Sequence, residues 1–186
     1  LCRVHYIHPP DVSIHLSQKE YISDLKMAPA RRQTAHAPAQ LSPAEVKILR
    51  GINGELQWLA TNTFPSLAAG VFISAGTVNS ATIADLQNAN RLVKTAQADK
   101  DIALIISPIP VERLRWITFS DSSWANRHDK SSQGGAVHIL ADESMLHGHQ
   151  AWASIIDWKS WKLNRVTKSS LAGEVQAFAE AQDRQE

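Results

Sequence analysis

The spacing of apolar and polar side chains divides the sequence into a helical part and a strand-rich part. Between residues 43 and 98, apolar positions recur at three- and four-residue steps, which is the period of an amphipathic helix. After Asp101 the pattern changes to short apolar runs typical of strands, and from Ser169 the helical period returns. We therefore predict helices first and a β-β-β-α unit after them.

The clearest helix start in the sequence lies at Ser42. This residue can cap the helix, a proline occupies the first helical position, and Glu45 can reach back to the cap. Further apolar segments begin at Pro65 and at residues 80–82, so three helices are expected within 43–98. The predicted inward positions are Leu49, Ile52, Leu56, Leu59, Ile83, Leu86, Leu92 and Val93.

The residues before Ser42 carry weaker signals. Residues 1–16 contain two adjacent prolines and predict an irregular or edge-strand lead-in. The run from Ser17 to Glu20 has the form of a capping box and predicts a short helix. Residues 28–41 contain further prolines and almost no large apolar side chain, so a linker or solvated loop is expected there.

The strand-rich part contains short apolar runs that end in turn residues. The strand candidates are residues 103–107, 114–120, 134–140 and 153–161. In the helix that follows, the side chains that share one apolar face are Leu171, Val175, Phe178 and Ala179. We predict that this face packs inward.

Composition limits the class of protein. The sequence has 186 residues, of which 44% are hydrophobic, enough for one sizeable core. Nineteen basic and eighteen acidic residues leave a net charge of +1, which indicates no polyanionic partner by itself. The single cysteine, Cys2, excludes a disulfide framework, and no apolar run is long enough to span a membrane. Without a secretion signal we expect an intracellular protein, and an opening without Met is expected of an internal piece of a longer chain.

Two acidic residues are candidates for chemistry. Asp121 follows a strongly apolar strand, where it either bonds its own turn amides or serves as a ligand for a hard cation. Glu174 lies on or beside the apolar face of the last helix, where a solvated surface glutamate is the alternative. If that helix crosses the sheet, both carboxylates can converge on one point, which would require a cation between them.

The segment 158–168 carries basic side chains and no acid. The basic residues are Lys159, Lys162, Arg165 and Lys168, interleaved with Trp158 and Trp161. Lys and Arg displace counterions from a nucleic-acid backbone, and aromatic rings pack on sugars or bases. A solvated turn whose tryptophans belong to the core explains the pattern equally well.

Other candidates are weaker. His147 and His149 flank a glycine, but no second cluster of ligands accompanies them, so a loop pair without a metal is the favoured interpretation. Asp129, Asp142 and Glu143 are interpreted as ordinary turn residues. The sequence contains no Gly-rich phosphate loop and no nucleophile elbow.

Three segments agree in order and spacing with known motifs. They are WITFSDSSWA (116–125), KSSQGGAVHIL (130–140) and IIDWKSWKLNRVTKSSLAGEVQAFAEA (155–181). Together they resemble the "SDADWA", "KSTSGY" and "SWKSKKQ…SSTEAEY" segments of the ribonuclease H region in copia-type retrotransposon Pol polyproteins. Upstream, LSQKEYISDLKMAP (16–29) and LRGINGELQWLATNTFPSLAAGV (49–71) are similar to the end of the reverse transcriptase in the same family.

The resemblance implies a ribonuclease H-like domain, which in the family cuts the RNA strand of an RNA–DNA hybrid. Asp121 matches the first catalytic aspartate and Glu174 the catalytic glutamate, so both would ligate Mg²⁺. In the family, two such ions roughly 4 Å apart activate a water and stabilise the leaving oxygen. Ser169 and Ser170 match serines at a helix start that can meet a phosphate. The side chains expected to hold the nucleic-acid backbone are Lys159, Lys162 and Arg165.

The sequence also departs from the family pattern. The family's later metal-binding carboxylates and its polymerase "YVDD" pair are expected to be missing. The family's "TRPD" is Thr63-Phe64-Pro65-Ser66 here, and its "EAE" is Ala172-Gly173-Glu174. We therefore expect impaired hydrolysis and no DNA synthesis.

These observations predict an α/β chain in two parts. Residues 1–101 are expected to form a helical reverse-transcriptase connection segment, and residues 102–186 a truncated ribonuclease H-like β-β-β-α unit. The expected partners are an RNA–DNA hybrid and the remainder of the Pol polyprotein, in the cytoplasm, a retroelement particle or the nucleus. The alternative is a non-catalytic nucleic-acid-binding or decayed retroelement remnant.

Overall fold

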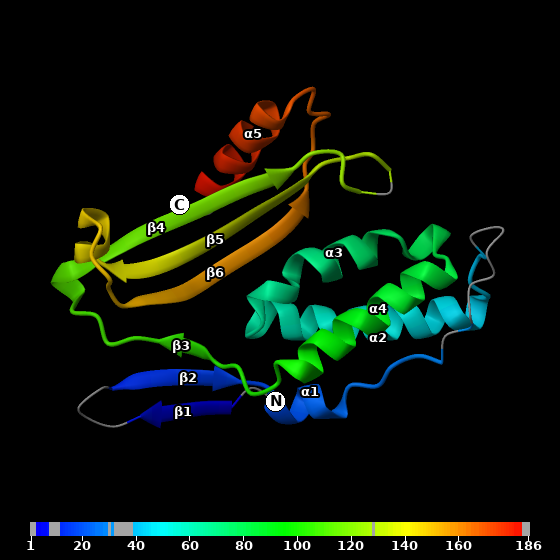
Figure 1. Ribbon diagram of the computed structural model, residues 1–186, viewed down its shortest axis with the longest axis horizontal. Helices are drawn as coiled ribbons and strands as arrows, with labels where there is room; N and C mark the ends of the chain where they lie inside the picture. Colours follow the sequence, from blue (N-terminus) through cyan, green and yellow to red (C-terminus); the bar gives the residue numbers. More distant parts are fainter. Residues whose placement is uncertain (1–2, 8–11, 30, 32–38, 128, 184–186) are drawn as a thin grey trace. The chain divides into compact units, whose positions relative to one another are not determined.

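The computed structural model describes residues 3–7, 12–29, 31, 39–127 and 129–183. It is a mixed α/β structure that contains two three-stranded sheets and five α-helices in the described residues (Figure 1). The chain divides into two compact units. One runs from Gln18 to Ile102, and the other combines the N-terminal strands with the residues from Ala103 onward.

The first unit is helical. Its helices are α1 (Lys19–Asp24), α2 (Pro43–Asn62), α3 (Ala68–Gly76) and α4 (Ile83–Ala98), with 3₁₀ turns at Pro65–Leu67 and Val78–Ser80. The capping box predicted for α2 is confirmed, because Glu45 accepts hydrogen bonds from the amide and hydroxyl of Ser42, both at 2.8 Å. Thr82 and Asp85 form a second capping box at the start of α4. None of the described helices is both long enough and apolar enough to cross a membrane.

The core of the first unit follows the predicted helix stripes. Its wholly or almost wholly buried members include Leu49, Ile52, Leu56, Leu59, Val71, Ile83, Leu86 and Val93, and Leu92 packs at its edge. Burying a side chain of this size contributes roughly 1.5–3 kcal/mol, so these contacts hold the helices together. Most of the predicted linker at 28–41 lies outside the described residues. Its described ends are bonded to α4 or to the residues just before it, through Ala28–Asn90 and Leu41–Ala81 hydrogen bonds.

The first sheet of the second unit is antiparallel, with the order β1-β2-β3. Its strands are β1 (Arg3–Ile7), β2 (Ser13–Ser17) and β3 (Leu104–Ile106). The predicted capping box at Ser17 is wrong, because this residue belongs to β2 and α1 follows Gln18, which makes no side-chain cap bond. Pairing with Arg3 of β1 holds Ser17 in extended backbone.

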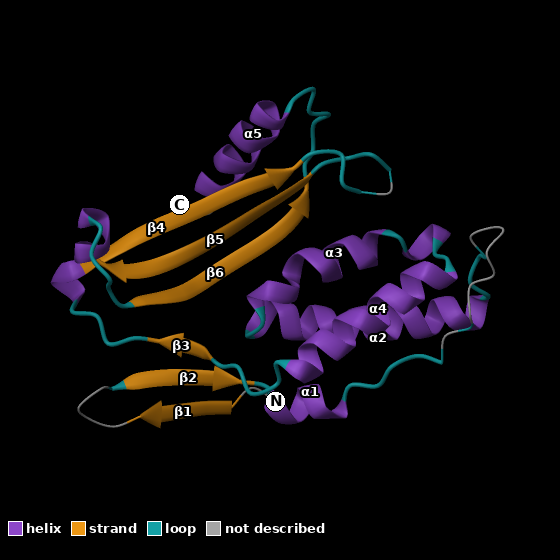
Figure 2. Cartoon of the chain, in the orientation of Figure 1, coloured by secondary structure: helices purple, strands orange, loops and turns teal. Residues whose placement is uncertain are grey.

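The second sheet is an antiparallel meander with the order β4-β5-β6 (Figure 2). Its strands are β4 (Leu114–Ser123), β5 (Gln133–Asp142) and β6 (Ala153–Lys162), with 3₁₀ turns at Val111–Arg113 and Glu143–His147. The second sheet thus has strands at three of the four predicted places, the fourth being β3 of the first sheet, and β4 continues three residues past Ser120. Ser107, after β3, donates its amide to the hydroxyl of Ser154 in β6 at 2.8 Å and so links the two sheets.

Helix α5 (Ser170–Gln182) packs on β4 and β5 (Figure 1). Its buried residues are small: Gly173, Ala177 and Ala181. The side chains predicted to face inward are instead exposed: Leu171 by 67%, Val175 by 60% and Phe178 by 51%. That prediction is wrong because the helix lies too close to the sheet for large residues. A Cβ added at Gly173 would lie only 2.6 Å from the Ser122 hydroxyl.

Candidate carboxylate pair and basic segment

Asp121 lies near the end of β4, opposite Gly135 of β5, and its side chain is exposed. One carboxylate oxygen accepts a hydrogen bond from the backbone amide of Ser122 at 2.7 Å. This is the local bond between an aspartate and a following amide that the structural interpretation of Asp121 predicted. Because the side chain is exposed, the carboxylate faces solvent rather than a packed core.

Glu174 lies in the first half of α5 and is also exposed. At 100° per residue, its position on the helix falls between the packing face that contains Gly173 and the outward stripe that contains Phe178. The glutamate is therefore at the border of the helix–sheet contact rather than within it.

The two acidic positions are brought together through their sequence neighbours. Ser122, next to Asp121, faces Gly173, next to Glu174, at the point where α5 lies against β4. Successive side chains of a strand point to opposite faces, so Asp121 projects from the face of the sheet opposite to that of Ser122. The structure thus brings the two backbone positions close, and the convergence of the two carboxylates stays a prediction.

The described residues fit a pair of metal ions poorly. Among them, no group of three or more His, Cys, Asp or Glu side chains is arranged to hold a metal ion. Two carboxylates would offset only two of the four charges of two Mg²⁺ ions, and Mg²⁺ requires a nearly octahedral set of oxygen ligands. His147 and His149 are exposed residues in and after the turn that follows β5.

The basic side chains of residues 158–168 are exposed but do not share one face. Lys159 lies 5.9 Å from the centre of the Trp161 ring, an arrangement that permits a cation–π contact. Strand alternation directs Lys159 and Lys162 to opposite faces of β6. Arg165 lies beyond the strand, in the segment that leads to α5.

Lys162 is engaged within the protein. Its ammonium group lies 2.6 Å from Asp129, and this hydrogen bond, together with those from Ser131, holds the pKa of the Asp129 carboxyl well below its usual range. Asp129 and Lys130 belong to the loop between β4 and β5, so the pair connects this loop to the end of β6. Lys162 must exchange Asp129 for a phosphate if it is to bind a nucleic acid.

Ser169 and Ser170 begin α5 as predicted. Ser169 is the N-cap, and its hydroxyl accepts a hydrogen bond from the amide of Ala172 at 3.2 Å. This satisfies one of the free amides of the first helical turn. The Ser169 side chain therefore has a structural role in the helix, and its binding to a phosphate stays a prediction.

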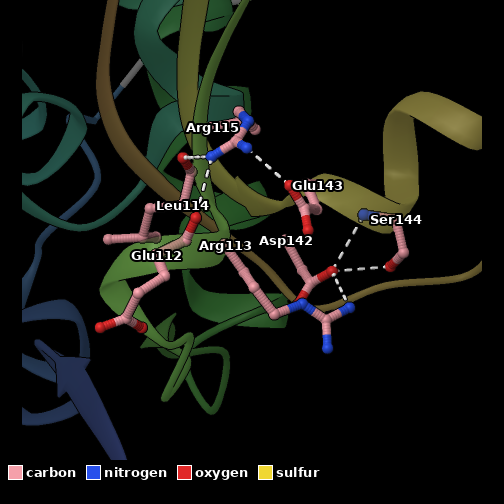
Figure 3. A network of polar contacts seen from close by, with 7 residues as sticks. All are labelled: Glu112, Arg113, Leu114, Arg115, Asp142, Glu143 and Ser144. Carbon is pink, nitrogen blue, oxygen red and sulfur yellow. Dashed lines mark hydrogen bonds and ion pairs between the residues drawn. The ribbon is translucent and has the colours of Figure 1, made fainter.

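A polar network that was not predicted lies at the other end of the second sheet (Figure 3). Arg113 bonds Asp142 at 2.7 Å, and Arg115 bonds Glu143 at 2.5 Å. The amide and hydroxyl of Ser144, together with Arg113, lower the pKa of the Asp142 carboxyl. The sequence does contain a signal for this network, namely two arginines at the start of one strand and two acids at the end of the next. Antiparallel pairing places these two ends side by side.

A second unpredicted cluster crosses the middle of the sheet. His138 of β5 is wholly buried, and its Nδ1 lies 2.8 Å from the Thr118 hydroxyl of β4. Its Nε2 lies 4.0 Å from the Asp157 carboxylate of β6. The register places these three residues side by side on adjacent strands.

Comparisons with known proteins do not assign the chain to a family. No family model, no curated protein and no solved structure matches the chain.

Proposed function

We propose that this chain is a piece of a copia-type retrotransposon Pol polyprotein, covering the end of the reverse transcriptase and the first half of a ribonuclease H domain. Its parent activity is the Mg²⁺-dependent hydrolysis of RNA in RNA–DNA hybrids. In this chain we expect hybrid binding with impaired cleavage, because the described residues supply only two of the carboxylates that the reaction requires.

The contact between Ser122 and Gly173 carries this proposal. It joins the strand of Asp121 to the helix of Glu174, which are the two elements whose motifs resemble the family. The antiparallel meander β4-β5-β6, followed by a helix packed over it, has the element order expected of the first half of a ribonuclease H domain. The resemblance supplies the substrate, and the packing is compatible with it.

The roles that these residues can perform follow from their exposure and charge. Asp121 and Glu174 are open to solvent, so they can accept hydrogen bonds from a bound water or cation. Lys159 and Arg165 are exposed cations that can contact phosphate oxygens, whereas Lys162 must first leave its ion pair with Asp129. Because the donor set does not fit two metal ions, no cleavage step is assigned to it.

Cleavage of an end-labelled RNA–DNA hybrid in Mg²⁺ or Mn²⁺ tests the proposed parent activity. We expect slow cleavage that is lost in Asp121→Asn and in Glu174→Gln. Asp24→Asn, which removes an exposed carboxylate from α1, is the matched control and should cleave as the unmodified chain does. Cleavage that survives both site substitutions would contradict the assignment of these carboxylates.

The alternative function is hybrid binding without cleavage. It is favoured because, in the described residues, no further metal ligands accompany the two exposed carboxylates. Binding through phosphate contacts weakens steeply with salt, because condensed counterions are released from the nucleic acid. We expect the slope of log affinity against log salt to fall in magnitude by about 2 in a Lys159→Ala, Arg165→Ala double variant, at roughly one unit for each lost contact. The matched control is Arg50→Ala, Lys94→Ala, on exposed positions of α2 and α4. Binding that does not depend on salt would contradict both functions.

A further inference from the structure

The loop between β4 and β5 places a carboxylate on a cation that the proposed nucleic-acid surface uses. One oxygen of Asp129 lies 2.6 Å from the ammonium group of Lys162, and the two side chains are 52% and 49% exposed. The other oxygen accepts hydrogen bonds from the amide and the hydroxyl of Ser131. Asp129 is thus held within its own loop by one oxygen and neutralises a strand cation with the other.

Lys162 lies on the same face of the second sheet as Asp121. The strand register aligns Asp121 with residue 160 of β6, two residues before Lys162. Residues two apart on a strand share a face, and so do residues paired directly across strands, whereas Lys159 projects from the opposite face. Of the two lysines in β6, Lys162 is therefore the one on the side of the candidate carboxylate.

The ion pair also lies at a cavity with an excess of positive charge. The cavity has a volume of about 450 Å³ and is lined by residues 129–132 of the loop and residues 162–167 at and after the end of β6. Its basic lining residues are Lys130, Lys162 and Arg165, and its acidic lining residue is Asp129. Cations gathered around one cavity favour an anion there, and the loop supplies one from the chain itself.

The loop has a backbone conformation that its residues do not favour. Ala125 and Lys130 have φ angles of 49° and 61°, in the left-handed region that is normally left to glycine. Lys130 is next to Asp129 in the sequence, so the bonds made by the loop must offset this strain. Residues of this kind are found at ligand clamps and switch regions, where a competing contact can release them.

We propose that Asp129 is a built-in competitor of the nucleic-acid phosphate for Lys162, so that the loop 129–131 lowers the affinity of the chain for an RNA–DNA hybrid. This competition rests on the hybrid binding proposed above and adds a control to it. A phosphate that reaches Lys162 has to replace the carboxylate, and a carboxylate left beside it would repel it. The hydrogen bonds from Ser131 do not involve Lys162, so the exchange does not require the loop to unfold.

The carboxylate is released by a competing anion rather than by protonation. Hydrogen bonds from Lys162 and from Ser131 hold the pKa of the Asp129 carboxyl well below its usual range, so the group stays ionised near neutral pH. An exposed ion pair contributes little to stability, which makes it easy to exchange for a phosphate contact.

A purely structural tie between loop and strand predicts the opposite effect on binding. If the pair only holds the loop in place, removing the charge of Asp129 loosens the loop and weakens hybrid binding. If Asp129 competes with phosphate, the same change strengthens it. Asp129→Asn separates the two cases, because asparagine keeps an acceptor oxygen for Ser131 and loses only the charge.

Fluorescence anisotropy with a labelled RNA–DNA hybrid, at several salt concentrations and without divalent ions, tests the competition. We expect Asp129→Asn to bind roughly two- to fivefold more tightly than the unmodified chain, the range set by the strength of an exposed ion pair. The slope of log affinity against log salt should steepen by about 0.9, for one added phosphate contact. Lys162→Ala should change the unmodified chain by less than about twofold, but should remove the whole gain from the Asp129→Asn chain.

Glu143→Gln is the matched control for the loss of one negative charge. It removes a carboxylate from the Arg115 pair, whose side chains are similarly exposed, at the opposite end of the same sheet (Figure 3). This variant should bind the hybrid as the unmodified chain does. An equal gain in Glu143→Gln would assign the effect to net charge and overturn the proposal.

The remaining outcomes separate this proposal from the proposed function. If the unmodified chain binds the hybrid and Asp129→Asn binds equally or more weakly, the competition is overturned and hybrid binding stands. If neither chain binds, the proposed function fails and the competition fails with it.

Carbon-detected NMR follows the exchange in the unmodified chain. The side-chain carboxyl signal of Asp129, assigned by its loss in Asp129→Asn, should move on addition of unlabelled hybrid toward the position that it has in Lys162→Ala. A carboxyl signal that keeps its position at saturating hybrid would show that the ion pair survives binding, which overturns the proposal.

Discussion

At the residue scale, the carboxylate of Glu45 shows how one side chain can support two neighbouring segments. It accepts hydrogen bonds from the Arg31 guanidinium at 2.9 Å and from the amide and hydroxyl of Ser42 at 2.8 Å. These donors, with Arg31 first among them, lower the pKa of Glu45 to about 2. One side chain thus caps α2 and joins it to the segment before it.

The lowered pKa of Glu45 predicts a pH-dependent contribution to stability. The folded-state pKa lies below the ordinary value of 4.5, so the contribution is fully present above that value and is lost as the pH falls toward about 2. We expect the difference in free energy of unfolding between the unmodified chain and Glu45→Gln to be constant near neutral pH. Urea unfolding at a series of acidic pH values should show it shrinking. Glu112→Gln, at an exposed position, is the control. A difference that persists unchanged into strong acid would contradict the role of the carboxylate.

The core of the first unit supports a second residue-scale prediction. Leu56 of α2 has no exposed surface, whereas Ile48 of the same helix is exposed. Leu56→Ala should lower the free energy of unfolding by ~2–5 kcal/mol through lost burial and a cavity. Ile48→Ala should change it by less than about 1 kcal/mol, since exposed positions are tolerant. Chemical denaturation followed by circular dichroism measures both changes. Equal losses of unfolding free energy would contradict the assignment of Leu56 to the buried face of α2 and of Ile48 to its exposed face.

At the element scale, local signals predicted which segments form helices and strands, and long-range packing decided how they are used. Ser42 and Pro43 specify the start of α2 within a few residues, so this helix could be predicted from sequence alone. The place of β2 in the first sheet could not, because it depends on pairing with residues 104–106, far along the chain. The inward face of α5 was missed because both its faces are apolar, and only the distance to the sheet selects the small residues.

The candidate site shows the same division between local and long-range information. The motifs around Asp121 and Glu174 could be identified from sequence, and so could the cap at Ser169. The direction of the Asp121 side chain could not, because it depends on which face of β4 receives the helix. The pairing of Lys162 with Asp129 could not be predicted from the sequence either, because one partner lies in a loop and the other at the end of a strand.

The close approach of α5 to β4 predicts an unusual response to a helix-favouring substitution. Gly173→Ala gains about 1 kcal/mol of helix propensity, but its Cβ would meet the Ser122 hydroxyl, at an overpacking cost of roughly 1–3 kcal/mol. We expect the single variant to be less stable than the unmodified chain. In a Ser122→Ala background the obstructing oxygen is absent, so the same Gly173→Ala change should stabilise. A double-mutant cycle from urea unfolding measures this, and additive effects would contradict the contact.

At the scale of the whole molecule, the two units have cores of different quality. The first is built on large aliphatic side chains such as Leu49, Leu59 and Leu86. In the second, the buried apolar residues are mostly small: Ala136, Ile139, Ala141, Trp161, Leu163, Ala177 and Ala181. Less apolar area is removed from water there, so the second unit should be the less stable one.

Amide hydrogen exchange tests this difference. Exchange of a protected amide requires local or global opening, and its rate reports the free energy of that opening. We expect amides in α2 and α4 to exchange at least roughly ten times more slowly than those in β4, β5 and β6. Equal protection in the helices and in the sheet would show that the two units open as one.

The division into two units also determines what each optical probe observes. Of the six tryptophans, only Trp58 lies in the first unit, and the other five belong to the second. Indole emission therefore follows the second unit, whereas far-ultraviolet ellipticity, to which α2, α3 and α4 contribute most of the helix, follows chiefly the first. In a Trp58→Phe chain all indole emission comes from the second unit, so one denaturation experiment with both detectors records two transitions where a single probe would record one.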